Sequence, residues 1–148
     1  MKEKIKVEFG NPYHGWLPVS LAAGQFELEI EASNVPANPI YLLVDALQKA
    51  LVGLESAVWW HLEPSGYYFN FIPLGNEECT LKITYTNGVA PEKVKNVFEM
   101  QGSFKQILLP FWRAVRKFDS HGYSEHHWPE TPTDDLYKLT TLINKLKS

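Results

Sequence analysis

The chain has 148 residues, of which 45% are hydrophobic and 21% charged, and its net charge is -3. This composition predicts a globular domain with its own core and excludes an intrinsically disordered chain. The acidic balance argues against nucleic acid as the main partner, because binding phosphates needs a basic surface. The charge is uneven: residues 1–100 carry 7 basic and 12 acidic groups, whereas residues 101–148 carry 7 and 5.

The cysteine count and the N-terminal stretch indicate the cellular compartment in which the protein is expected. Cys79 is the single cysteine, so an internal disulfide is excluded and a reducing environment fits. The opening stretch MKEKIKVEFG lacks the apolar centre of a signal peptide, and no apolar run approaches the ~18 residues needed to cross a bilayer. We therefore expect a cytoplasmic protein that does not enter a membrane.

The first clear element is GQFELEIEAS, residues 24–33, where apolar and acidic residues alternate with a period of two. This pattern predicts a strand with one buried face, formed by Phe26, Leu28 and Ile30, and one acidic face, formed by Glu27, Glu29 and Glu31. The preceding WLPVSLAAG predicts its hairpin partner, in which Pro18 would fit an edge strand or a bulge.

A helix is predicted over residues 39–52. Asn38 is a suitable N-cap, Pro39 suits the first helical position and Gly53 suits the stop. Its apolar positions recur at helical spacing: Ile40, Leu43, Val44, Leu47 and Leu51.

Three further strands are predicted as a meander, SAVWWHLE, YYFNFIPL and CTLKITYT, joined by turn-forming residues. In the first, Trp59, His61 and Glu63 would share one face. VKNVFEMQG, residues 94–102, predicts a short sixth strand, although one helical turn would also fit it.

The last third is predicted to be helical. Ser103 would cap a helix that Pro110 should kink, and Thr131 would cap a final helix with Pro132 in its first position. The final helix has a narrow apolar stripe that would pack on the sheet or on another subunit: Leu136, Leu139, Ile143 and Leu146. We therefore predict one α+β domain over residues 1–148, with a mainly antiparallel sheet of five or six strands covered by helices.

The stretch HGYSEHHWPE, His121 to Glu130, is a candidate metal site because it holds three histidines and two glutamates. Three or four ligands must converge on one ion, yet Gly122 and Pro129 make regular structure improbable. A polar connector between helices, anchored by Tyr123 and Trp128, explains the segment better, so we expect no metal and no cofactor there.

A second candidate combines HGW, His14 to Trp16, with WWHLEP at residues 59–64. His61 and Glu63 could act together in acid–base chemistry, but polar residues two apart on a strand usually mark its solvated face. Trp59 would share that face, and an exposed indole is a common interface anchor.

A third candidate is the row Glu27, Glu29 and Glu31, which either protects an exposed sheet from pairing or attracts a basic partner. Nucleophilic and nucleotide-dependent chemistry find no support. The chain has no G-x-S-x-G, no G-x-G-x-x-G and no P-loop, and Cys79 lies in a register that predicts a buried, inert thiol.

The combination HGWLPVSL, FELEIEASNVPANPIYLLVDALQKALVG, WWHLEPSGYYFNF and FWRAVRKF resembles a set of uncharacterised bacterial proteins of similar length. Some such small acidic proteins accompany polymorphic toxins, so the resemblance implies an immunity-like role and brings no catalytic residues with it.

We therefore predict a non-catalytic protein that binds a basic protein, using Glu27, Glu29, Glu31, Trp59, His61, Glu63, His14 and Trp16. The alternative is a small metal-dependent or small-molecule-binding enzyme that uses His14, His61, Glu63 or the segment from His121 to His127. Neither nucleic acid nor a membrane is expected as a partner, and the C-terminal stripe makes a homodimer possible.

Overall fold

The computed structural model describes residues 4–35, 37–88, 94–121, 127–129 and 133–147. Seven strands form one antiparallel sheet whose spatial order follows the chain: β1 Ile5–Phe9, β2 Trp16–Ala23, β3 Phe26–Ser33, β4 Ser56–His61, β5 Gly66–Gly75, β6 Glu78–Thr86 and β7 Lys95–Ser103. The helices are α1 Pro39–Leu51, α2 Phe104–Ile107, α3 Leu109–His121 and α4 Thr133–Lys147. The α+β architecture is thus confirmed, but the expected five or six strands are seven.

Strand β1 was not predicted from the sequence. Its inner-facing residues Ile5, Val7 and Phe9 lie opposite inner-facing residues of β2, so the period-two pattern was present in the charged N-terminus. The other expected strands form, and the segment of doubtful type becomes β7. Pro18 lies inside β2, between β1 and β3, rather than on an edge. It is tolerated because it lies beyond the end of β1, where its carbonyl accepts a bond from the Gly10 amide.

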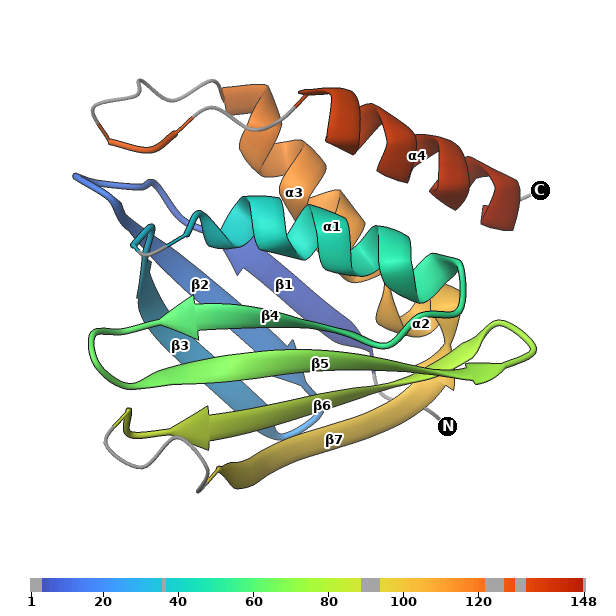
Figure 1. Ribbon diagram of the computed structural model, residues 1–148, viewed down its shortest axis with the longest axis horizontal. Coiled ribbons are helices and arrows are strands. Elements are labelled where there is room, and N and C mark those ends of the chain that lie inside the picture. The colour runs from blue at the N-terminus through green and yellow to red at the C-terminus, as the bar shows by residue number, and fades with distance from the viewer. Residues whose placement is uncertain (1–3, 36, 89–93, 122–126, 130–132, 148) are drawn as a thin grey trace.

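The sheet bends between β3 and β4. Ser33 and His61 form the single register pair between these strands, whereas β2 and β3 pair along eight positions. From that contact β3 diverges from β4, and Phe26 at its other end stacks on Phe98 of β7, with ring centroids 4.4 Å apart. The halves β1–β3 and β4–β7 therefore enclose the core from two sides. Figure 1 shows α1, α3 and α4 together along one side of the strands, with α4 outermost.

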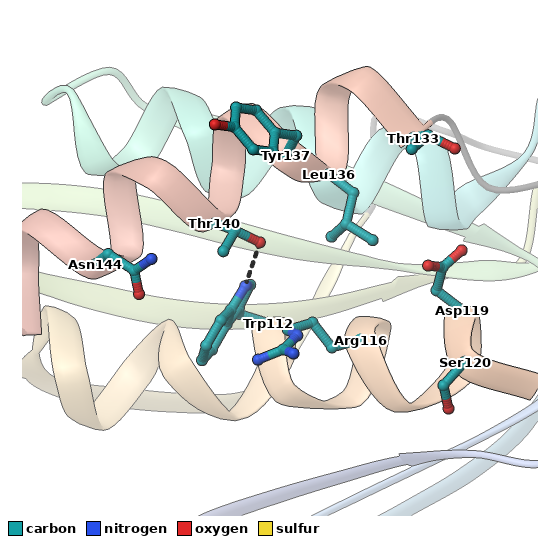
Figure 2. Close-up of a pocket in the computed structure, with 9 residues that line it drawn as sticks. All are labelled: Trp112, Arg116, Asp119, Ser120, Thr133, Leu136, Tyr137, Thr140 and Asn144. Carbon is teal, nitrogen blue, oxygen red and sulfur yellow. Dashed lines mark hydrogen bonds between the residues drawn. The ribbon is translucent and has the colours of Figure 1, made fainter.

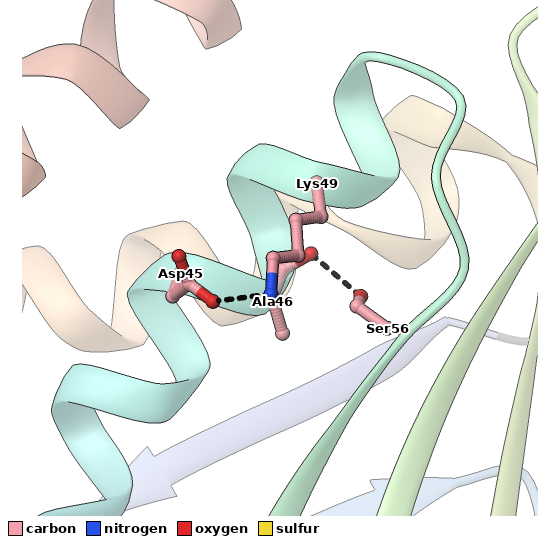
Figure 3. Close-up of polar contacts among 4 residues, drawn as sticks. All are labelled: Asp45, Ala46, Lys49 and Ser56. Carbon is pink, nitrogen blue, oxygen red and sulfur yellow. Dashed lines mark hydrogen bonds and ion pairs between the residues drawn. The ribbon is translucent and has the colours of Figure 1, made fainter.

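Helix α1 begins and ends as its sequence predicts. The Asn38 side chain accepts a bond from the Ile40 amide, Pro39 occupies the first turn, and Gly53 follows the helix with a φ of 89°. Ser56 at the start of β4 donates to the Ala46 carbonyl at 2.8 Å, and Asp45 and Lys49 form an ion pair on the outer face (Figure 3). The Ser56 bond holds α1 against β4, whereas the ion pair joins two residues within the helix.

The C-terminal helices differ from the prediction in two respects. The expected kinked helix is divided into α2 and α3, with Leu108 between them, because Pro110 lacks the amide hydrogen that would continue α2. The predicted cap at Ser103 is confirmed as a reciprocal pair of bonds with Gln106. The predicted cap at Thr131 lies outside the described residues.

The apolar stripe of α4 packs within the chain. Leu139 and Ile143 are fully buried, and α4 lies along α1 rather than on the sheet. The apolar stripe from which a homodimer was predicted therefore packs against the rest of the same chain. Among the described residues, no helix combines the length and apolarity that a membrane crossing needs.

Candidate functional site

The outer face of the sheet is a candidate partner-binding surface because the helices pack on the inner face. Ser56, which bonds α1, points inward with Val58 and Trp60, whereas Ala57, Trp59 and His61 point outward. The register carries this division across every strand, since directly paired residues share a face. Six of the eight predicted partner-binding residues lie on this outer face: Trp16, Glu27, Glu29, Glu31, Trp59 and His61.

The acidic stripe consists of Glu27, Glu29 and Glu31 on the outer face of β3. All three side chains are exposed, and none forms a salt bridge within the part of the chain that the structure describes. Their outward neighbours on β2 are the small or neutral residues Ala22, Ser20 and Pro18, so no cation neutralises them from the paired strand. The stripe therefore carries uncompensated negative charge.

A hollow of about 570 Å³ lies over β1–β3 at the acidic stripe. Its lining includes the carboxylates of Glu8, Glu29 and Glu31, and the small side chains of Pro18 and Ser20 give it room. Glu8 is paired with Lys6 at 3.3 Å, which leaves the other two carboxylates for a basic group from outside. The hollow has the charge and the size to receive a lysine or arginine side chain.

Outward-facing aromatic side chains form a row on β4 and β5. The Trp59 ring centroid lies 4.6 Å from that of Tyr68 and 5.6 Å from that of His61, on which it stacks. Trp59 covers the backbone at Gly66, since a Cβ there would come within 2.3 Å of the indole. The Nδ1–H of His61 donates to the Val35 carbonyl at 2.6 Å, because a carbonyl oxygen can only accept. Trp59, His61 and Tyr68, the aromatic row, are therefore half-buried and held in place.

The acidic stripe and the aromatic row meet at one end of the sheet. Ser33 pairs with Trp16 on β2 and with His61 on β4, so these outward-facing residues follow one another across three strands. Glu31 is the acidic residue nearest to this position in the chain, and Glu27 is the farthest. The sheet thus brings together the aromatic and acidic candidates that are about 30 residues apart in the sequence.

The structure places His14 with His127 instead of with His61. Their ring centroids are 5.0 Å apart, and Tyr13 stacks on His127 at 5.2 Å. The Gly15 amide also donates to the His127 carbonyl at 2.8 Å, so this contact closes one loop on another. Trp128 beside it is almost fully buried, which confirms its predicted anchoring role. The rest of the candidate metal segment, residues 122–126 with Tyr123 and His126, and Glu130 lie outside the described residues.

The predicted His61–Glu63 pair is wrong. Strand β4 ends at His61, and Glu63 is an exposed turn residue with a φ of 61°, so the two side chains do not share a strand face. The described residues contain no group of three His, Cys, Asp or Glu side chains placed to hold a metal ion. Burial, with a smaller contribution from Glu78, raises the pKa of the Cys79 thiol to about 12, which favours the inert protonated form.

A groove between α3 and α4 was not predicted from the sequence. It has a volume of about 540 Å³, and Trp112 is one of the residues that line it. The Trp112 Nε1–H donates to the Thr140 hydroxyl at 3.1 Å, so this bond joins α3 to α4 (Figure 2). The Arg116 guanidinium lies 5.1 Å from the Trp112 ring centroid, and Tyr137 projects at the rim. The sequence signal was an arginine four residues after a tryptophan, a spacing that places both on one helix face.

Comparison with known proteins gives little beyond this geometry. No protein-family model matches the chain, and no curated protein matches it. A solved structure described as "CdiA-CT/CdiI toxin and immunity complex from Enterobacter cloacae" is similar with a TM-score of 0.44 and 13% sequence identity. The match covers 79% of this chain and 99% of that one. A likeness at this level does not assign a function.

Proposed function

We propose that the protein has no chemistry of its own and binds a basic protein through the outer face of its sheet. The observation that carries the proposal is the acidic stripe: Glu27, Glu29 and Glu31 are exposed on a helix-free face, without salt bridges in the described chain. Like charges on one strand face repel one another, at a cost of about a few tenths of a kcal/mol per pair. A basic partner would remove that repulsion and would be attracted from a distance.

The aromatic row supplies the second part of such an interface. Interface energy is concentrated in a few large side chains, among which tryptophan and tyrosine are enriched. Trp59 and Tyr68 are half-buried and their rings pack against each other, so they lose little side-chain freedom when a partner covers them. We assign long-range attraction to the acidic stripe and short-range anchoring to the aromatic row.

The biological setting that we propose is an immunity-type protein that binds a basic toxin. This part rests on the resemblance to small acidic bacterial proteins that accompany polymorphic toxins. The proposed role needs no catalytic group, and it needs a charged surface that reaches its partner quickly. A homodimer, the other assembly that the sequence suggested, would have to use a surface other than the buried stripe of α4.

The test compares two variants with the same change in net charge. Glu27, Glu29 and Glu31 are changed to lysine in one, and the exposed Glu77, Asp119 and Asp134 are changed to lysine in the other. Each is used to capture protein from the native host, and the captured protein is then purified for measurement of association rates. The stripe variant should associate at least about tenfold more slowly at low salt, because charge complementarity acts mainly on the association rate.

The control variant should retain most of the association rate, and raising the salt concentration should reduce the difference between wild type and the stripe variant. Melting curves of both variants establish that the fold is intact. Equal rates for the two variants would contradict the proposal. A metabolite that raises the melting temperature, together with no captured protein, would favour the enzyme alternative instead.

A further inference from the structure

The edge of β3 that faces β4 is unpaired over most of its length. Ser33 is the one residue of β3 that pairs with β4, so residues from Phe26 to Ala32 have a strand neighbour only on the β2 side. An unpaired strand edge exposes amide hydrogens and carbonyl oxygens in the spacing that another strand requires. The bend in the sheet thus creates a free edge in the interior of the strand order.

The direction of the free backbone groups follows from one hydrogen bond. The Asn34 amide donates to the Gly15 carbonyl, which precedes β2, so the backbone of residue 34 points toward β2. Backbone groups alternate in direction along a strand, and the register of β2 with β3 is continuous. The amides and carbonyls of Glu27, Glu29 and Glu31 therefore point away from β2, toward the free edge.

The inner side of the same edge is apolar and incompletely covered. Phe26, Leu28 and Ile30 face the core but are only partly buried, whereas their partners on β2, Leu21 and Val19 among them, are almost fully buried. The free edge accordingly presents three rows together: carboxylates outside, backbone groups in the middle and apolar side chains inside. Such a combination matches one kind of occupant.

We propose that an extended segment of the basic partner adds as a strand to the free edge of β3. This inference rests on the proposed function and specifies how the partner binds. Alternate residues of the segment would be lysine or arginine, facing Glu27, Glu29 and Glu31, and the residues between them would be apolar and contact Phe26, Leu28 and Ile30. Main-chain bonds provide affinity in such strand addition, and the alternating side chains provide specificity.

The negative charge of the free edge suits both the protein without a partner and the protein with a bound basic segment. Without a partner, three adjacent carboxylates discourage pairing between copies of this chain, because identical edges repel. A segment with lysine or arginine at every second position meets the opposite condition, since each cross-strand pair then joins unlike charges. The edge therefore selects a basic strand against a second copy of itself.

The experiment uses a synthetic peptide of alternating lysine and valine, with a control peptide of the same composition in which all lysines precede all valines. Both carry the same charge, but only the first can place lysine on one face and valine on the other. We expect the alternating peptide to bind at least about tenfold more tightly.

Two variants separate backbone pairing from charge. Glu29→Gln removes the carboxylate and keeps the amide, whereas Glu29→Pro also removes the amide hydrogen that points to the free edge. Neither change breaks a bond to β2, so both should fold. Glu29→Pro should bind the alternating peptide about tenfold more weakly than Glu29→Gln does, the effect of one lost hydrogen bond.

Amide hydrogen exchange of the wild type gives a readout that needs no variant. The amides of Glu27, Glu29 and Glu31 should exchange quickly in the free protein and become protected when the alternating peptide is bound. Equal affinities for the two peptides, equal affinities of the two variants, unchanged exchange or no binding at all would each overturn strand addition. The proposal that the acidic stripe attracts a basic protein would not be affected, because charge reversal at the stripe tests it separately.

Discussion

Ser33 of β3 pairs with His61 of β4, and this single register position joins the two halves of the sheet. The same contact places the aromatic row next to the acidic stripe and leaves the rest of the β3 edge free. His61 also donates from Nδ1 to Val35, two residues after Ser33, so its ring ties β4 to the segment that follows β3. The proposed interface therefore depends on the contacts that fix His61 beside Ser33 and Val35.

Gly66→Ala should destabilise the protein. An added Cβ would lie 2.3 Å from the Trp59 ring and 2.5 Å from the Trp60 carbonyl oxygen, and such crowding costs about 1–3 kcal/mol of the free energy of unfolding. Denaturant unfolding measures the loss. The double variant with Trp59→Ala should show less than the sum of the two effects, because one of the two collisions is removed. Strict additivity would mean that the Trp59 ring does not lie over Gly66.

Cys79 should resist thiol reagents in the folded protein. Burial raises the pKa of its thiol to about 12, so at pH 8 the reactive thiolate is almost absent. In the unfolded chain the thiol ionises with a pKa of about 8.5. The unfolded state therefore loses a proton first as the pH rises, and this contribution to stability is present below about pH 8.5 and declines above it.

Iodoacetamide labelling measured with and without denaturant checks the reactivity of Cys79. The pH dependence of the unfolding free energy between about pH 8 and 10 checks the linkage, with Cys79→Ala as the control that should lose this part of the slope. Fast labelling of the native protein would contradict the buried position of the thiol.

Local patterns predicted single elements well. The alternation in residues 24–33 and the capping signals around α1 are properties of neighbouring residues, and both elements form where expected. β1 carries the same alternation in Ile5, Val7 and Phe9, but charged residues surround these three positions and hide the pattern. Pro110 was placed in a helix interior because helical spacing continues through it, although the missing amide divides the segment in two.

Contacts between distant segments could not be predicted. The outward position of Trp59, His61 and the glutamates follows from alternation alone, so most of the candidate surface was predictable. The contact of His14 with His127 joins residues 113 apart, and no local pattern encodes it. The same is true of the bend between β3 and β4, because the pattern of one strand does not state how much of its neighbour it will pair with.

Trp112 and Thr140 should be energetically coupled. Trp112→Phe removes the indole donor, and Thr140→Val removes its acceptor while the nearly buried indole keeps its hydrogen. The first change should cost about 1 kcal/mol and the second about 1–3 kcal/mol of the free energy of unfolding. The double variant should cost less than their sum, since neither polar group is then left behind. Denaturant unfolding of the four proteins measures the coupling, and additive losses would show that the bond across the α3–α4 groove contributes nothing.

Trp59→Ala should speed dissociation of the captured basic partner and leave its association rate nearly unchanged. Removing a large anchor from an interface acts on the lifetime of the complex, whereas the charges that control the first encounter are untouched in this variant. Loss of such an anchor costs about 2 kcal/mol or more, which corresponds to an increase in the dissociation rate of at least about thirtyfold. Surface plasmon resonance with the purified partner measures both rates.

Tyr137→Ala is the matched control, because Tyr137 is an aromatic residue with 74% of its surface exposed on α4, away from the sheet. Its dissociation rate should equal that of the wild type. A melting curve of Trp59→Ala separates loss of an anchor from loss of the fold, since the indole also covers Gly66. Two results would contradict binding at the outer face of the sheet: a stable Trp59→Ala protein with unchanged dissociation, or a Tyr137→Ala protein with fast dissociation. Either would mean that the partner binds the helical side.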